Sequence, residues 1–124
     1  MSVAYRNQKV YSYTAFAKRM ESRPPVPYKR FRCAMPGWDN SPRRERDAMI
    51  FHGSTPEHFE SWLRALVRET LARFAGEERI LFVNAWNEWA EGNHLEPDQR
   101  WGRAYLEATA RALVAAGAVA AMKS

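Results

Sequence analysis

Cysteine is nearly absent from this chain of 124 residues, because Cys33 is the only one. No disulfide can therefore form within the chain, and the three histidines offer no His/Cys spacing of the kind that binds zinc. A lone cysteine with apolar neighbours is usually a small core residue, and this is the position expected for Cys33. The sequence thus predicts neither a metal ion nor a cofactor.

Long hydrophobic runs are missing as well. The amino terminus lacks the apolar core of a signal peptide. The most apolar stretch, from Ala112 to Met122, is rich in alanine, contains Gly117 and is shorter than the ~20 residues that a membrane helix needs. We therefore expect no membrane span and a cytoplasmic protein.

Lysine is scarce too, and arginine supplies most of the formal net charge of +5. The basic residues are scattered along the chain, and their densest group, Arg43, Arg44 and Arg46, is interrupted by Glu45. Nucleic-acid-binding proteins usually gather such charges into a stripe or patch. We therefore expect a solvated basic surface and no nucleic-acid partner.

Aromatic residues, by contrast, are abundant, at 13% of the chain with five tryptophans. Tryptophan usually fills a core or stacks on a ligand. Apolar residues make up 46% and charged residues 27%, which is an ordinary globular composition. Length and composition thus predict one small domain over residues 1–124.

Residues 1–27 are expected to form an irregular or helical lead-in. The apolar spacing between Val10 and Met20 fits a short helix about as well as an irregular aromatic stretch. Three prolines between residues 24 and 27 then exclude a helix and favour an extended connection. Residues 28–124 are expected to hold the regular βα units.

The first unit is a strand followed by a helix. Alternation over residues 28–35 predicts a strand that has Phe31, Cys33 and Met35 on its apolar face. Residues 56–75 carry an apolar stripe at helical spacing and predict an amphipathic helix capped by Thr55. A polar loop is expected between the two.

The second unit repeats this order. The apolar run at residues 80–83 is typical of a parallel strand covered on both sides. A last helix is expected to begin near Gln99 or Arg100, with Asp98 as its N-cap, and to end at Gly117. The order strand, helix, strand, helix predicts a parallel α/β sheet or barrel.

Polar and aromatic residues follow directly after each predicted strand, where α/β folds bind their ligands. Glu88 and Glu91 could divide acid and base work, as paired carboxylates do in glycosidic chemistry. Their separation places them on one side if the chain turns helically. Trp86 and Trp89 flank the pair, would raise the carboxyl pKa by desolvation, and could stack on a sugar. The alternative is that both are exposed loop acids or ion-pair partners of Arg100 and Arg103.

Other residues in these loops are candidates for contacts with a sugar. His94 could bind a hydroxyl or shuttle a proton, and Glu96 could accept bonds from hydroxyls. Trp38 is either a stacking platform or a lid on the core, whereas His52 and His58 are expected on the surface. The candidate substrate-binding residues are Trp38, Asp39, Asn84, Trp86, Asn87, Trp89, His94 and Glu96.

Two segments carry a resemblance to a known family. Residues 36–43 read Pro-Gly-Trp-Asp-Asn-Ser-Pro-Arg, and residues 84–98 read Asn-Ala-Trp-Asn-Glu-Trp-Ala-Glu-Gly-Asn-His-Leu-Glu-Pro-Asp. Together they resemble the WbsX-like proteins, which are described as polysaccharide-biosynthesis glycosyltransferases and are also called glycoside hydrolase family 99-like. The similarity runs from about Lys29 to Ala108.

This resemblance implies a (β/α)8 TIM-type barrel, a fold that needs ~250 residues. The chain would then be the carboxy-terminal part, about two βα units, and the missing amino-terminal part of the barrel would be its partner. The resemblance also implies that Glu88 is the base toward a sugar 2-hydroxyl and Glu91 the acid/base. Ala90 stands where the related hydrolases have histidine, which leaves their substrate preference open here.

The resulting hypothesis is a fragment of a carbohydrate-active enzyme. It would transfer or hydrolyse glycosyl units in polysaccharide or lipopolysaccharide metabolism, with an oligosaccharide or polysaccharide as substrate. The alternative is a non-catalytic sugar-binding remnant of such an enzyme. Whether a chain of this length is an enzyme by itself stays open.

Overall fold

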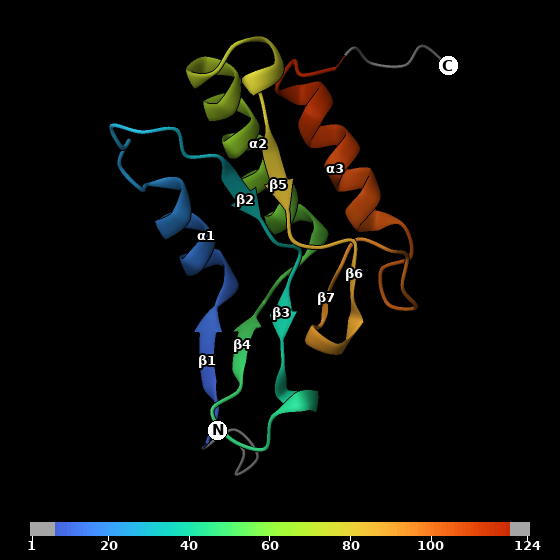
Figure 1. Cartoon of the computed structure of the whole chain (residues 1–124). Helices are drawn as coiled ribbons and strands as arrows, with labels where there is room; N and C mark the ends of the chain where they lie inside the picture. Colours follow the sequence, from blue (N-terminus) through green and yellow to red (C-terminus); the bar gives the residue numbers. More distant parts are fainter. Residues whose placement is uncertain (1–6, 120–124) are drawn as a thin grey trace.

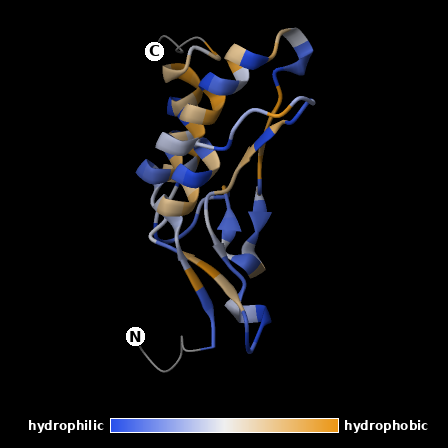
Figure 2. Ribbon diagram, turned by 90° about the vertical axis from the view of Figure 1, so that its left-hand side faces the viewer, coloured by the Kyte–Doolittle hydropathy of each residue, from blue (hydrophilic) through white to orange (hydrophobic). Residues whose placement is uncertain are grey.

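The computed structural model describes residues 7–119 of the chain (Figure 1). The elements follow the order β1 (Lys9–Ser12), α1 (Tyr13–Glu21), β2 (Arg32–Ala34), β3 (Trp38–Asp39), β4 (Met49–His52), α2 (Pro56–Arg73), β5 (Leu81–Val83), β6 (Asn87–Glu88), β7 (Asn93–His94) and α3 (Ala104–Ala115). Figure 2 shows the layer of helices and the layer of strands from the side.

Three small sheets make up the strand layer. β2 and β5 pair in parallel, with Cys33 opposite Phe82, as expected for consecutive strands of an α/β unit. β4 pairs in parallel with β1 and antiparallel with β3, and β6 and β7 form an antiparallel hairpin. Within residues 7–119 these sheets do not close into a barrel.

Helix α2 confirms the predicted amphipathic helix, apart from its last two residues. The Thr55 side chain accepts a hydrogen bond from the His58 backbone N–H at 3.2 Å, and Pro56 occupies the first helical position. The helix ends at Arg73, and Gly76, with a φ of +55°, follows it. The capping residue and the apolar stripe therefore fix the start and the buried face of this helix.

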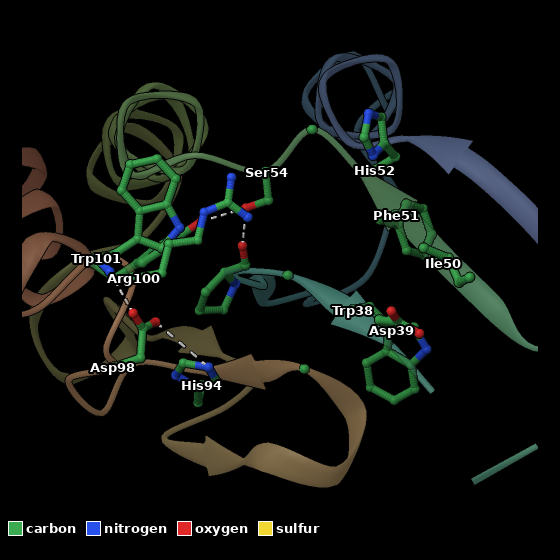
Figure 3. Close-up of a pocket in the computed structure, with 15 residues that line it drawn as sticks. Trp38, Asp39, Ile50, Phe51, His52, Ser54, His94, Asp98, Arg100 and Trp101 are labelled. Carbon is green, nitrogen blue, oxygen red and sulfur yellow. Dashed lines mark hydrogen bonds and ion pairs between the residues drawn. The ribbon is translucent and has the colours of Figure 1, made fainter. Parts of the chain in front are cut away.

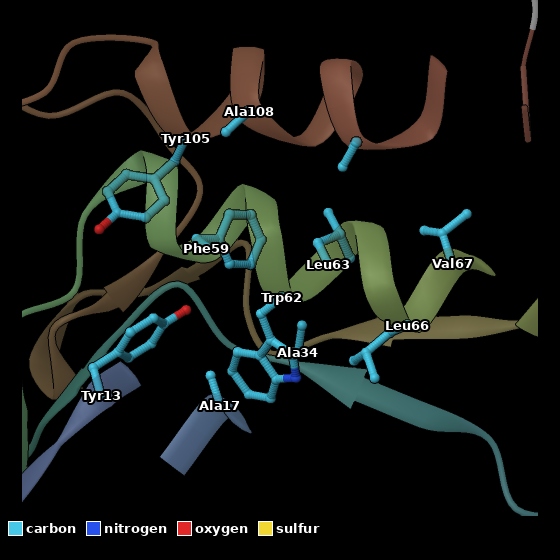
Figure 4. Close-up of a cluster of buried hydrophobic side chains, with 11 residues drawn as sticks. Tyr13, Ala17, Ala34, Phe59, Trp62, Leu63, Leu66, Val67, Tyr105 and Ala108 are labelled. Carbon is cyan, nitrogen blue, oxygen red and sulfur yellow. The ribbon is translucent and has the colours of Figure 1, made fainter. Parts of the chain in front are cut away.

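The core lies around the buried face of α2 (Figure 4). Trp62 packs edge-on against Tyr13 and Phe16 of α1, with ring centroids 5.9 Å away in both cases. On the α3 side, Ala108 and Ala112 are fully buried, and their small side chains let α3 approach α2 closely. Helix α2 is thus the element that joins α1, α3 and the β2–β5 pair.

Strand β2 buries the face opposite to the one predicted. Arg32, at 6% exposure, and Ala34 face α2, whereas Cys33 is exposed, so the expectation of a core position for Cys33 is wrong. The reason is an ion pair, because Arg32 Nη2 lies 2.9 Å from Glu69 Oε2 and also donates to the Glu21 carbonyl oxygen at 3.1 Å. A cation can be buried when it is paired and hydrogen-bonded in this way.

Strand β5 is covered on only one face, which corrects the expectation of cover on both sides. Phe82 is 56% exposed and lies opposite the exposed Cys33. The two side chains therefore belong to one bare apolar face of the β2–β5 pair, on the side away from α2.

Two other boundaries differ from the prediction. Residues 9–12 form β1 before α1 begins, and the Ser12 hydroxyl caps α1 by accepting from the Ala15 backbone N–H at 3.2 Å. Helix α3 starts at Ala104, and Asp98 instead accepts from the Trp101 backbone N–H at 2.6 Å, in a turn before the helix. Asp98 is therefore not the N-cap of α3.

Within the described residues, no helix is long and apolar enough to cross a membrane. Residues 7–119 also hold no cluster of three or more His, Cys, Asp or Glu side chains that could bind a metal ion. Residues 1–6, where no signal peptide is expected, and residues 120–124 lie outside the part that the structure describes.

Replacing Thr55 by Ala is expected to lower the free energy of unfolding by about 1 kcal/mol, because the His58 N–H loses its acceptor. Urea denaturation followed by circular dichroism measures the change. Thr55→Ser keeps the hydroxyl and should restore most of the loss. Equal losses in both variants would show that the methyl group, rather than the cap, carries the effect.

Candidate functional site

Two loops meet at the carboxyl ends of β2 and β5, which point to the same edge because the strands are parallel. A Cβ atom on Gly37 would lie 3.1 Å from the Gly92 carbonyl oxygen, so this contact favours glycine. Gly92 has a φ of +54° and lies against the backbone of Asp39. The loop that follows β2 and the hairpin that follows β5 are therefore packed together at their glycines.

Glu88 and Glu91 lie in the loop after β5. Trp89–Glu91 form one turn of 3-10 helix, which contains Glu91 but not Glu88. Glu88 precedes this turn, as the last residue of β6 and the N-cap of the turn. Glu88 is exposed, and Glu91 is partly buried, with Oε1 3.4 Å from Arg43 Nη1.

The partner of Glu91 is thus Arg43, from the loop after β3, and not Arg100 or Arg103 as in the alternative weighed from the sequence. This ion pair connects the two segments that carry the family resemblance. Because Arg43 is largely exposed, the pair contributes little to stability, and a charged or polar ligand can displace it.

Trp89 is held by residues that were candidates for binding sugar. Its indole stacks on His94 with ring centroids 3.7 Å apart and planes inclined by 16°. Its Nε1 donates to Glu96 Oε2 at 2.6 Å. Trp89 still remains 47% exposed, and Trp86 is 52% exposed. Two indoles therefore stand open to solvent beside the carboxylates, and His94 and Glu96 orient one of them.

A pocket of about 470 Å³ lies between β3, β4, the β6–β7 hairpin and the start of α3 (Figure 3). Of the candidates taken from the sequence it brings together Trp38, Asp39 and His94. The remaining candidates lie outside its wall, namely Glu88, Glu91, Asn84, Trp86, Asn87, Trp89 and Glu96. Asn84 lines a second, mainly apolar pocket of about 600 Å³, which it shares with Trp38.

A partly buried hydrogen-bond network supports the floor of the first pocket. The Ser54 hydroxyl donates to the Pro36 carbonyl oxygen and lies 2.7 Å from the Tyr105 hydroxyl. The Tyr13 hydroxyl donates to the adjacent Met35 carbonyl oxygen at 2.8 Å. Burial is the main cause that raises the pKa of both Tyr13 and Tyr105, so both phenols stay protonated and can donate.

This network fixes the carbonyl groups from which the chain enters β3, and with them the position of Trp38. Sequence reasoning missed Ser54 and Tyr105 as parts of the site, because each bonds to a segment far from it along the chain. Arg100 and Trp101 were missed as pocket residues as well. The guanidinium carbon of Arg100 lies 5.0 Å from the centroid of the Trp101 ring. His58 and His52 are exposed, as expected, although His52 also lines the pocket.

Comparison with known proteins identifies relatives. A model of the protein family described as "Glycosyltransferase WbsX" matches residues 1–109. The chain is 43% identical over 111 residues to "Uncharacterized protein WxcX" of Xanthomonas campestris pv. campestris, in strain B100 and equally in strain ATCC 33913. The match covers 90% of this chain but spans only 16% of the length of each relative. No solved structure matches.

Proposed function

Because this chain belongs to the glycosyltransferase WbsX family, we propose that it is part of a carbohydrate-active enzyme that makes or breaks glycosidic bonds. The observation that carries the proposal is the loop after β5. There, Glu88 ends β6 and Glu91 ends the 3-10 turn that follows, in the same loop as two exposed indoles, those of Trp86 and Trp89. Carboxylates supply acid and base, and indoles stack on the apolar face of a sugar ring.

In the proposed reaction Glu88 acts first as a base. Its carboxylate removes the proton of the sugar 2-hydroxyl, whose oxygen attacks the anomeric carbon and forms a 1,2-anhydro sugar. Glu91 donates its proton to the departing glycosidic oxygen in the same step. Water or a sugar hydroxyl then adds to the anomeric carbon, Glu91 takes its proton, and Glu88 returns a proton to the 2-oxygen.

The β2–β5 pair is proposed to be part of a (β/α)8 barrel. The pair is parallel, α2 covers one of its faces, and the other face is bare at Cys33 and Phe82. In a TIM barrel the helices cover the outside, and the inner face meets the other strands. The greater length of the relatives is consistent with further strands, so the rest of such a barrel is the proposed partner of this chain.

The proposed substrate is an oligosaccharide or polysaccharide, in cytoplasmic steps of polysaccharide or lipopolysaccharide metabolism. The exposed indoles also fit a second candidate, a sugar-binding protein without turnover, because stacking alone needs no carboxylate.

Reaction in water enriched in ¹⁸O tests the proposal on a full-length relative that carries both motifs. The substrates are glycans from the bacterial surface, and mass spectrometry of these glycans after the reaction distinguishes the outcomes. A new reducing end labelled with ¹⁸O indicates hydrolysis, and an elongated, unlabelled glycan indicates transfer. Glycan binding without either product contradicts an enzyme and favours the sugar-binding candidate.

A further inference from the structure

The pocket of Figure 3 is lined by residues other than the two candidate catalytic glutamates. Neither Glu88 nor Glu91 lines it, but Gly92, the neighbour of Glu91, does. We infer that this pocket is a separate subsite, which binds one uncharged pyranose unit next to the glycosidic bond that reacts. The identity of the ligand as a sugar rests on the proposed function, whereas its neutral charge follows from the residues of the pocket.

Size and shape fit a single sugar unit. The volume of about 470 Å³ lies in the lower part of the range of small-molecule sites, about 300–1,000 Å³. Figure 3 shows Trp101 and Arg100 at one end of the pocket and Trp38 and Asp39 at the other. The pocket therefore offers an indole and a polar side chain at each end, which suits a ring with apolar faces and hydroxyl edges.

The hydrogen-bonding groups of the wall are only partly used within the protein. Asp39 accepts from the Ser41 backbone N–H at 2.9 Å through Oδ1, and no protein donor within residues 7–119 reaches its Oδ2. Arg100 makes no ion pair with the carboxylates of the described residues, and its guanidinium lies over the Trp101 ring. One acceptor and several donors thus remain for ligand hydroxyls.

The charges of the wall argue for an uncharged ligand. The carboxylates of Asp39 and Asp98 face a single guanidinium, that of Arg100. His52 and His94 add positive charge only when protonated, and His94 Nε2 already lies 3.8 Å from Asp98 Oδ2. A uronate or phosphate would meet two carboxylates for one fixed cation, whereas a hydroxyl can bond to either kind of group.

Arg100 is the residue on which binding should depend most. It is exposed, so replacing it does not disturb the core, and a hydrogen bond to its charged group contributes more than a neutral one. Arg103 provides a matched control, because it is also an exposed arginine of the same segment but does not line the pocket.

The test uses the full chain with Glu88→Gln and Glu91→Gln, so that no turnover can occur, on a glycan array. The array carries neutral bacterial hexose oligosaccharides together with their uronate-bearing and phosphorylated counterparts. We expect neutral glycans to bind best, Arg100→Gln to weaken their binding roughly 10- to 100-fold, and Arg103→Gln to change it less than 2-fold.

Three results would overturn the inference: no binding to any glycan, a preference for the charged glycans, or equal losses in the two arginine variants. The outcome is independent of catalysis. Neutral-glycan binding that depends on Arg100, in an enzyme that proves inactive, leaves the subsite standing and removes the proposed function. Turnover whose KM and kcat are both unchanged by Arg100→Gln supports the proposed function and removes the subsite.

Discussion

Glutamine in place of Glu88 or Glu91 is expected to lower turnover by the proposed enzyme roughly 10²- to 10⁴-fold. The amide has nearly the shape of the carboxyl group but can neither take a proton from the 2-hydroxyl nor give one to the leaving oxygen, and proton transfer of this kind contributes a factor of that size. The measurement is kcat of a full-length relative with the corresponding substitution, on the substrate found by isotope labelling. Both side chains lie at the surface edge of the fold, so the variants should remain folded.

Glu96→Gln is the matched control for this experiment. Glu96 belongs to the same loop, and its Oε2 accepts from Trp89 Nε1, a bond that the oxygen of a glutamine amide can also accept. We expect a loss of less than about 10-fold, since only the orientation of the indole is affected. Full activity in Glu88→Gln or Glu91→Gln would remove that residue from the proposed mechanism.

Arg43 adds a constraint on how Glu91 can work. Its guanidinium lies 3.4 Å from Oε1 of Glu91, while both proposed steps need that carboxyl group at the glycosidic oxygen. The exposed guanidinium can swing away when a glycan enters, because an exposed ion pair contributes only about 0–1 kcal/mol. Substrate binding would therefore have to release Glu91 from Arg43 before Glu91 can act on the glycosidic oxygen.

The sequence predicted the parts of the fold that depend on local patterns. Helix α2 was found because its apolar stripe, its cap at Thr55 and Pro56 all act within a few residues of each other. Strand β5 was found as a short apolar run, and its parallel pairing with β2 was expected from the order of the elements. The placement of polar loops after both strands followed from the same order, and so did the candidate site.

What the sequence did not predict depends on contacts between distant residues. The alternation in β2 pointed to the wrong face because Arg32 is buried by pairing with Glu69, which is 37 positions away. Strand β4 was missed because it pairs with β1 and β3, which were not predicted as strands either. The spacing of apolar and polar residues along a sequence shows which side chains are polar. It does not show which distant partner allows a polar side chain to be buried.

The same limit explains what was missed in the pocket. Ser54 contacts Tyr105, which is 51 positions away, and both act through the backbone of the loop after β2. The motif residues Trp38, Asp39 and His94 were recognised individually, but the packing of Gly37 against Gly92 and the Arg43–Glu91 ion pair bring their loops together. The wall of the site is thus made by tertiary contacts, whereas its carboxylates could be read from the sequence.

Trp62→Ala is expected to cause the largest loss of stability in the chain, about 3–5 kcal/mol. Trp62 is 1% exposed and packs against Tyr13 and Phe16, so alanine would leave a cavity where α1 and α2 meet. A domain is stable by only about 5–15 kcal/mol, so the variant should be mostly or entirely unfolded by low concentrations of urea. Far-UV circular dichroism is the suitable signal, because the substitution removes a fluorophore.

Two further variants separate packing from other effects of Trp62. Trp62→Phe keeps much of the aromatic volume and removes an indole N–H that has no hydrogen-bond partner within residues 7–119, so its loss should be only about 1–2 kcal/mol. Trp86→Ala removes an indole that is half exposed and should cost less than about 1 kcal/mol. If Trp62→Ala proved as stable as Trp86→Ala, α1 would not be packed on α2 as described. The β2 end of the site would then lack its support, because Tyr13, the donor to the Met35 carbonyl oxygen, belongs to α1.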